Sequence, residues 1–117
     1  QVAALNLIRL EDQYPEPVPV GAPAGSPERR GFALFSGRCL RCHSVNGQGS
    51  KIGPDLNEPM SVTTYRSKKM VKEFIRNPSK YRHTYMPDHR DLSAPQLEEL
   101  WRYFRWLDQH RPPSAGW

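Results

Sequence analysis

Three stretches of the chain carry apolar residues three or four positions apart, which predicts three amphipathic helices. The first should follow Ser26, because a serine hydroxyl caps a helix N-terminus well and Pro27 suits the first helical position. Its apolar residues lie between Gly31 and Phe35, and we expect it to end near Gly37.

The other two helices are predicted from about Tyr65 to Arg76 and from Ser93 onward. The second helix has an apolar stripe of Met70, Val71, Phe74 and Ile75. It should stop at Asn77-Pro78, because the residue before a proline disfavours helix. A capping-box sequence opens the third helix, whose stripe is Leu97, Leu100, Trp101, Phe104 and Leu107. No strand-like alternation of useful length is present, so the fold class predicted is all-α.

The N-terminal stretch has a different composition from the rest. Five of the twelve prolines fall within residues 1–27, which predicts an extended arm. A disordered leader and an arm that lies on a partner subunit both fit this composition, and we hypothesise the second. The predicted organisation is therefore a Pro-rich arm at 1–27, one domain at 28–111 and a short tail at 112–117.

The apolar supply is thin for a compact domain. Only 37% of the 117 residues are hydrophobic, so a single small domain would be marginal unless something else contributes to its core. No apolar run is long enough to span a membrane, and residues 1–10 lack the regions of an intact signal peptide.

Both cysteines of the chain fall in one pentapeptide, Cys39-Leu-Arg-Cys42-His43. This C-x-x-C-H pattern is typical of covalent haem attachment, in which two thiols reach one porphyrin and the adjacent histidine supplies an axial nitrogen. A zinc site would need further ligands such as His83 or His89. A thiol–disulfide pair would need a βαβ context that the sequence does not show.

Four features, in this order along the chain, make residues 28–108 resemble the class I, mitochondrial-type c-type cytochromes in their small bacterial monohaem form. They are Gly31-x-x-x-Phe35 before the haem motif, the loop Gly53-Pro54-Asp55-Leu56, the pair Met86-Pro87, and the aromatic sequence from Leu100 to Phe104. The resemblance implies the class I cytochrome c fold, with three main helices around one haem c bound through Cys39 and Cys42.

The resemblance also implies a role for individual positions. His43 matches the proximal iron ligand, and Pro54 matches the proline whose carbonyl accepts from the proximal imidazole. Met86 matches the distal ligand. Met60 near the loop and Met70 on the second helix are the other methionines, and core packing is the expected role of Met70.

The remaining distal candidates are His83 and His89, which we interpret as solvent-exposed loop residues. In the resemblance, Gly31 and Phe35 pack on the C-terminal helix, where their contacts would be Leu100 and Tyr103. These are structural positions, not catalytic ones.

With both axial positions filled by protein, the expected function is one-electron transfer rather than catalysis, by a free carrier or a subunit beside a dehydrogenase or respiratory complex. The alternative is a haem enzyme or gas sensor with an open or labile distal site. Because the haem would complete the thin core, we also expect the chain without haem to be largely unfolded.

Positive charge is concentrated outside the arm. The arm holds one arginine against three acidic residues, a net charge of −2. Because the whole chain carries +5, residues 28–117 carry +7. Its densest run is Arg66, Lys68, Lys69, Lys72, Arg76, Lys80 and Arg82. This run indicates either an ordinary solvated face or a docking surface for an acidic redox partner; nucleic-acid binding competes poorly.

Tyr65 and Arg66 are weak candidates for propionate contacts. Haem attachment in this family takes place outside the cytoplasm, which predicts a periplasmic location or the outer face of the bacterial inner membrane.

Overall fold

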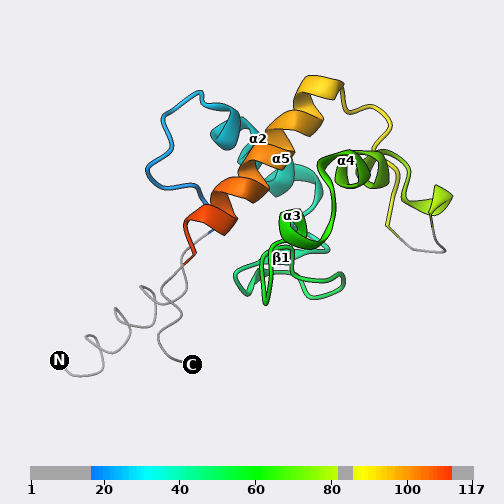
Figure 1. Cartoon of the computed structure of the whole chain (residues 1–117), viewed down its shortest axis with the longest axis horizontal. Coiled ribbons are helices and arrows are strands. Elements are labelled where there is room, and N and C mark those ends of the chain that lie inside the picture. The colour runs from blue at the N-terminus through cyan, green and yellow to red at the C-terminus, as the bar shows by residue number, and fades with distance from the viewer. Residues whose placement is uncertain (1–16, 82–85, 112–117) are drawn as a thin grey trace.

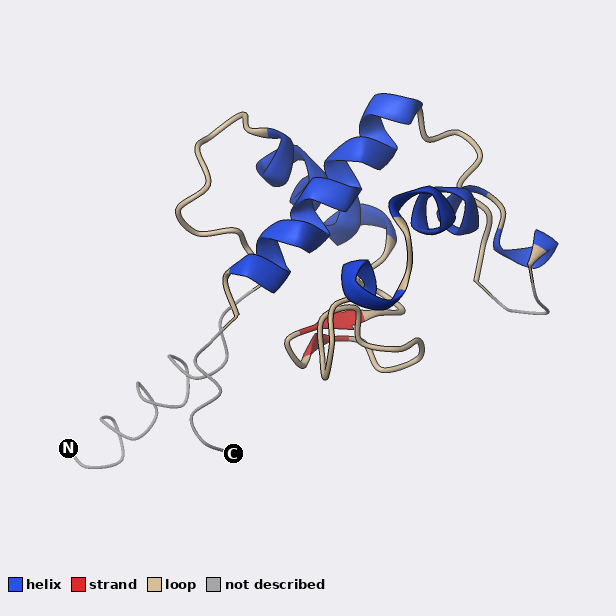
Figure 2. Cartoon of the chain, in the orientation of Figure 1, coloured by secondary structure: helices blue, strands red, loops and turns tan. Residues whose placement is uncertain are grey.

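The structure is a computed structural model that describes residues 17–81 and 86–111. Its elements follow the order α2 (Pro27–Arg38), β1 (Ser44–Val45), β2 (Gln48–Gly49), α3 (Val62–Tyr65), α4 (Lys68–Arg76), the 3-10 turn η1 (Pro78–Lys80) and α5 (Ala94–Gln109). The predictions for residues 1–16, Arg82, His83 and the tail 112–117 lie outside the described residues. Figures 1 and 2 show a mostly helical molecule with one small sheet below the helices.

Helices α2 and α5 cross and form the centre of the fold (Figure 1). The serines predicted as caps occupy those positions: Ser26 accepts from Arg29 N, and Ser93 forms a complete capping box with Gln96. At the crossing, Phe35 is fully buried and its ring centroid lies 5.5 Å from that of Tyr103. The two predicted terminal helices and their packing are therefore confirmed.

Gly31 approaches Tyr103, as expected, and also the backbone of Glu99, which was not expected. A Cβ at Gly31 would lie 2.0 Å from Glu99 O and 2.8 Å from Tyr103 Cβ. The resemblance had implied Leu100 and Tyr103. Leu100 is buried in the same core, but the backbone of Glu99 makes the closest approach.

The helix predicted from about Tyr65 to Arg76 is wrong at its start. The chain instead forms a four-residue helix α3, then breaks at Arg66, whose backbone is extended at φ −131° and ψ 142°. Helix α4 starts anew behind Ser67, whose hydroxyl accepts from Met70 N. The two serines Ser61 and Ser67 each cap a separate helix, and this local capping divides the predicted segment. The predicted stop at Asn77-Pro78 is confirmed.

The Gly-rich loop contains a short hairpin that the sequence did not predict. Strands β1 and β2 pair antiparallel, with Ser44 opposite Gly49 and Val45 opposite Gln48. Asn46 and Gly47 make the turn with positive φ angles of 51° and 79°. Such a two-residue Asn-Gly turn is strongly favoured in hairpins, but strands of two residues leave no alternation to detect. The class predicted, an all-α fold with the class I cytochrome c arrangement, stands.

Part of the N-terminal arm lies on the chain's own helices. Tyr103 Oη donates to Pro17 O over 2.7 Å, and Arg29 Nε donates to Ala22 O over 3.0 Å. Pro19 and Ala22 are buried. Residues 17–26 therefore contact α2 and α5 of the same chain (Figure 1), and the hypothesis that the arm lies on a partner stays a prediction.

Among the residues described, no helix has the length and apolar character needed to cross a lipid bilayer.

Candidate functional site

The end of α2 positions the two cysteines. Cys39 N donates to Phe35 O as the helix ends, and the next turn closes with His43 N donating to Cys39 O over 2.8 Å. Both thiols are free of a disulfide, with Cys39 buried and Cys42 partly exposed. Burial raises the pKa of the Cys39 thiol to about 11. Cysteines that catalyse thiol–disulfide exchange have lowered pKa values, so this environment disfavours that alternative.

The His43 imidazole is fixed by a backbone carbonyl. His43 Nδ1 lies 2.7 Å from Pro54 O, the contact that the resemblance implied. A carbonyl oxygen can only accept, so Nδ1 carries the proton in this contact and Nε2 presents its lone pair. The site thus holds one histidine nitrogen in the form that binds a metal.

Gly53 lies directly against the same ring. A Cβ at this position would fall 2.6 Å from His43 Cε1 and 2.8 Å from Nδ1, closer than side chains approach one another. Gly53 N donates to Cys42 O, so the loop is also tied to the cysteine turn. Only a glycine leaves room for the imidazole at this point.

Asp55 is a residue of the site that the sequence reasoning missed. It lies in the loop Gly53-Pro54-Asp55-Leu56, where the resemblance assigns a role to Pro54 and none to Asp55. Its Oδ2 accepts from Ser44 Oγ and Gly47 N, and its Oδ1 accepts from Asn57 N and Glu58 N, all within 2.8 Å. Burial tends to raise the pKa of Asp55, but these hydrogen bonds outweigh it and hold the pKa below its ordinary value. The available sequence signal was an aspartate directly after a Gly-Pro pair, because an aspartate side chain in a turn readily accepts from the backbone amide two residues ahead.

The distal candidates differ in exposure. Met86 is half-buried, whereas Met60 and Met70 are 49% and 38% exposed. The expected core role of Met70 is therefore wrong in this structure, where Val71 and Ile75 make the buried face of α4. His89 is buried, contrary to the expectation that it is exposed. Its burial and, to a smaller extent, the positive charge of the nearby Arg38 lower its pKa.

His89 is not part of a metal-binding cluster in the part of the chain that the structure describes. No group of three or more His, Cys, Asp or Glu side chains lies close enough there to hold an ion. The zinc alternative, as far as it relied on His89, has no support.

Two lysines of the predicted docking surface have a structural partner instead. Lys68 Nζ and Lys72 Nζ lie 2.7 Å and 2.6 Å from Glu98 Oε1 on α5. Hydrogen bonds from Lys68 and then Lys72 lower the pKa of Glu98 to about 2. Both ion pairs join α4 to α5, and the single Glu98 carboxylate offsets one of the two positive charges.

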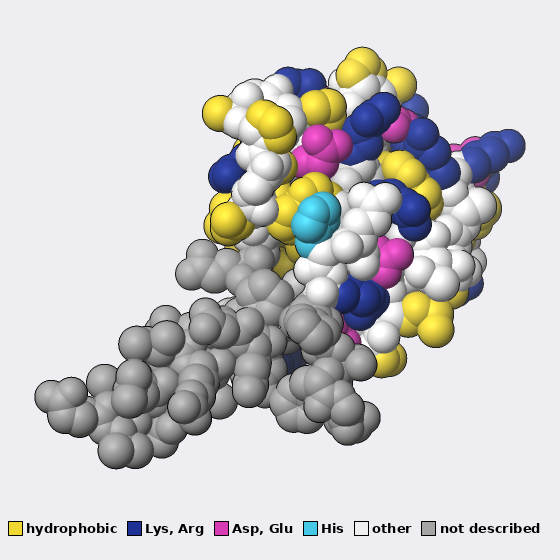
Figure 3. All heavy atoms as spheres, turned by 60° about the vertical axis from the view of Figure 1, so that its left-hand side comes forward, with side chains coloured by type: hydrophobic (Ala, Val, Ile, Leu, Met, Phe, Trp, Pro, Cys, Tyr) yellow, Lys and Arg dark blue, Asp and Glu magenta, His cyan; other side chains and the backbone are white. Residues whose placement is uncertain are grey.

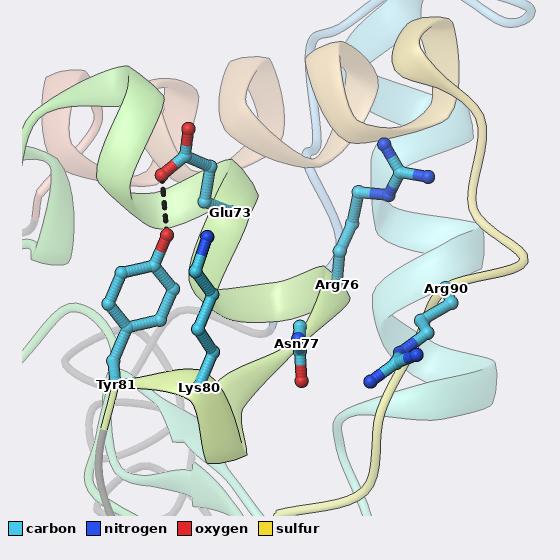
Figure 4. Close-up of a pocket in the computed structure, with 6 residues that line it drawn as sticks. All are labelled: Glu73, Arg76, Asn77, Lys80, Tyr81 and Arg90. Carbon is cyan, nitrogen blue, oxygen red and sulfur yellow. Dashed lines mark hydrogen bonds between the residues drawn. The ribbon is translucent and has the colours of Figure 1, made fainter.

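Further along, positive side chains line a pocket of about 340 Å³. The lining residues are Glu73, Arg76, Asn77, Lys80, Tyr81 and Arg90 (Figure 4). Tyr81 Oη donates to Glu73 over 2.6 Å, which occupies the carboxylate of the lining (Figure 4). Elsewhere, Figure 3 shows Lys and Arg side chains spread over the face it presents, with acidic side chains between them. The pocket is therefore a local concentration of positive charge.

Arg66 packs on its neighbour Tyr65. Its guanidinium carbon lies 5.3 Å from the centroid of the Tyr65 ring, and Tyr65 is 46% exposed. Their proposed contact with haem propionates stays a prediction.

In this small all-α domain, α2 crosses α5 at a glycine and ends in a C-x-x-C-H turn, whose histidine is held by a loop carbonyl. These features together define a c-type haem protein. The family model for cytochrome c matches residues 28–108, and the chain belongs to the cytochrome c family. No solved structure was found to match the chain.

Members of this family carry covalently bound haem c, and the residues of this site fit that group. The donor set comprises two thiols free of a disulfide and one histidine nitrogen with its lone pair available. The Gly53 cradle keeps space for the imidazole. On the loop and on α4, Ile52, Met60 and Met70 expose apolar surface outside the core cluster.

Proposed function

We propose that the chain is a monohaem electron-transfer protein in which Cys39 and Cys42 attach the haem and His43 and Met86 provide its axial ligands. The haem supplies a one-electron iron couple. The observation that supports this most directly is the 2.7 Å contact between His43 Nδ1 and Pro54 O. It holds the ring in one tautomer with the metal-binding nitrogen facing away from the loop carbonyl.

Methionine as the second ligand favours the ferrous state more than a second histidine does, so it would raise the reduction potential. Such a site transfers electrons and leaves no position for a substrate. The proposal therefore predicts a low-spin haem that does not take up carbon monoxide readily.

The three methionines provide a matched test of the distal ligand. In Met86→Ala, the sulfur-to-iron charge-transfer band of the ferric protein should disappear and the ferrous protein should bind carbon monoxide. In Met60→Ala and Met70→Ala, the band should persist, because these side chains are proposed to have no ligand role. A wild-type protein that is high-spin and binds carbon monoxide would instead support a haem enzyme or gas sensor.

For the partner, we propose an electron-exchange protein with an acidic docking surface, such as a dehydrogenase or a membrane respiratory complex. The net charge of +7 on residues 28–117 and the cations around the Figure 4 pocket support this. Arg76 and Lys80 have no ion pair among the described residues, whereas Lys68 and Lys72 are paired with Glu98.

Electron exchange with a small anionic reagent, ferrocyanide, tests which charges attract a partner. Lys80→Ala should slow the reaction more than Lys68→Ala, although both variants lose one positive charge. The difference should shrink above about 0.1 M salt, where the Debye length falls to about 10 Å. Equal rates for the two variants would contradict a localised docking surface.

We further propose that the protein resides in a bacterial periplasm or on the outer face of the inner membrane. Covalent haem attachment in this family takes place outside the cytoplasm, which supports the assignment. Cell fractionation followed by a haem stain checks it, and a haem-containing cytoplasmic pool would contradict it.

A further inference from the structure

The segment after the cysteines and the Gly-Pro loop run alongside each other as a ladder of contacts between residues eleven positions apart. Gly53 N donates to Cys42 O, and His43 Nδ1 donates to Pro54 O. Next along the ladder, Ser44 Oγ donates to Asp55 Oδ2, and further on Asn57 Nδ2 donates to Asn46 Oδ1. The contact that orients His43 is thus one rung of a longer structure.

Asp55 joins the two segments of this ladder through its carboxylate. Through Oδ2 it accepts from Ser44 and Gly47, which follow His43 in the chain. Through Oδ1 it accepts from Asn57 N and Glu58 N, which follow Pro54. Bonds to an ionised acceptor are stronger than bonds between neutral groups.

The backbone nitrogen of Pro54 does not help to hold its carbonyl in place. Proline has no amide hydrogen, so it cannot donate to the segment that carries His43. The backbone contacts on either side, from Gly53 N to Cys42 O and from Leu56 N to Ser44 O, fix the loop at two points. Between these two points, Asp55 directly follows Pro54, and its carboxylate accepts the four hydrogen bonds described above.

We propose that Asp55 is a positioning residue: by joining Ser44 and Gly47 to the loop beyond Pro54, its carboxylate holds the Pro54 carbonyl against His43 Nδ1. The inference deepens the proposed function, on which it rests, because a stronger bond at Nδ1 makes the imidazole a better electron donor to iron. Asp55 thereby lowers the reduction potential without touching the metal ligand.

A carboxylate near the iron would also lower the potential simply by its negative charge, so the test must separate charge from position. Asp55→Glu keeps the charge but lengthens the side chain, which breaks the fit to four donors. Ser44→Ala removes one of the four hydrogen bonds and changes no charge, and it provides a milder variant if Asp55 variants fold poorly. Glu98→Gln is the control, because it removes a hydrogen-bonded carboxylate that binds α4 to α5.

Two measurements on the ferrous and ferric holoprotein decide the matter. The first is the midpoint potential. The second is the NMR exchange rate of the His43 Nδ1 proton, which reports the bond to Pro54 and not the overall stability. Asp55→Glu should raise the potential and speed exchange roughly tenfold, the factor that corresponds to losing one hydrogen bond. Ser44→Ala should shift both in the same direction by less, and Glu98→Gln should shift neither.

If Asp55→Glu and Ser44→Ala both keep the wild-type potential and proton exchange rate, Asp55 does not position Pro54 and the proposal is wrong. Failure of the proposed function would look different, because the wild-type protein itself would then lack the low-spin spectrum. The two failures are therefore distinguishable in the same set of samples.

Discussion

Replacing Gly31 with alanine should destabilise the domain, although alanine is the better helix former. In an exposed helix interior, glycine costs about 1 kcal/mol relative to alanine, so propensity alone predicts a gain. Gly31 lies in the middle of α2, where that helix crosses α5. The outcome depends on what the new methyl group would meet.

The geometry makes the clash decisive. The added Cβ would fall 2.0 Å from Glu99 O and 2.7 Å from Glu99 C, and these are backbone atoms that cannot rotate away. Ordinary contact begins near 3.4 Å, so α2 and α5 would have to separate by about 1 Å or more. Overpacking of a core costs typically 1–3 kcal/mol, and this crossing also carries the packed rings of Phe35 and Tyr103. We expect a net loss of about 2 kcal/mol.

Gly37→Ala provides the matched control in the same helix. A Cβ at Gly37 meets nothing within 4 Å, so this variant should be neutral or more stable by up to about 1 kcal/mol. Thermal unfolding of the holoprotein, followed by circular dichroism, measures both. For Gly31→Ala a fall on the order of 10 °C is expected, since about 4–8 °C corresponds to 1 kcal/mol in a small domain. Equal melting temperatures for the two variants would refute the reasoning.

Three further predictions follow from other contacts. The pKa of Glu98 is lowered from 4.5 to about 2, so the ionised carboxylate stabilises the fold fully at pH 7 and this stabilisation is lost as the pH falls through about 2. Acid titrations should therefore show Glu98→Gln less stable than the wild type at pH 7, with the difference disappearing near pH 2. Tyr103→Phe removes the hydrogen bond to Pro17 O, so it should cost about 1 kcal/mol and speed proteolytic cleavage of residues 17–26, with unchanged cleavage contradicting the contact. The double variant Cys39→Ala/Cys42→Ala should lose most of its helical circular dichroism, and native-like helix would contradict a haem-dependent core.

Local signals made the terminal helices predictable. Ser26 and Ser93 cap the helices that their sequences predicted, because N-capping depends on residues only three apart. The contact between His43 and Pro54 was also anticipated, through the resemblance and not through spacing. A motif of five residues together with its partner loop was enough to locate that part of the site.

Predictions that required long-range information succeeded less often. Nothing local showed that Lys68 and Lys72 would lie beside Glu98, since their partner is on another helix. His89 resembled a polar loop residue, yet the packing of its loop buries it. Likewise Met70 shares the spacing of the core residues of α4 but lies at the edge of the buried face, where periodicity alone cannot distinguish it.

The same contacts link the iron-binding loop to the helical core. Asn57, fully buried, is the last rung of the ladder that begins at Cys42, and its Nδ2 also lies within 3.4 Å of Leu107 O on α5. Beyond the end of α5, Arg111 donates to Asn57 O and forms ion pairs with Glu58 and Asp108. The loop that carries Pro54 is therefore fixed at one end to the cysteine turn and at the other to α5. Since α5 also packs against α2, whose end carries Cys39, both routes from the site lead to the same helix crossing, and a loosened crossing should disturb His43 as well as the stability of the fold.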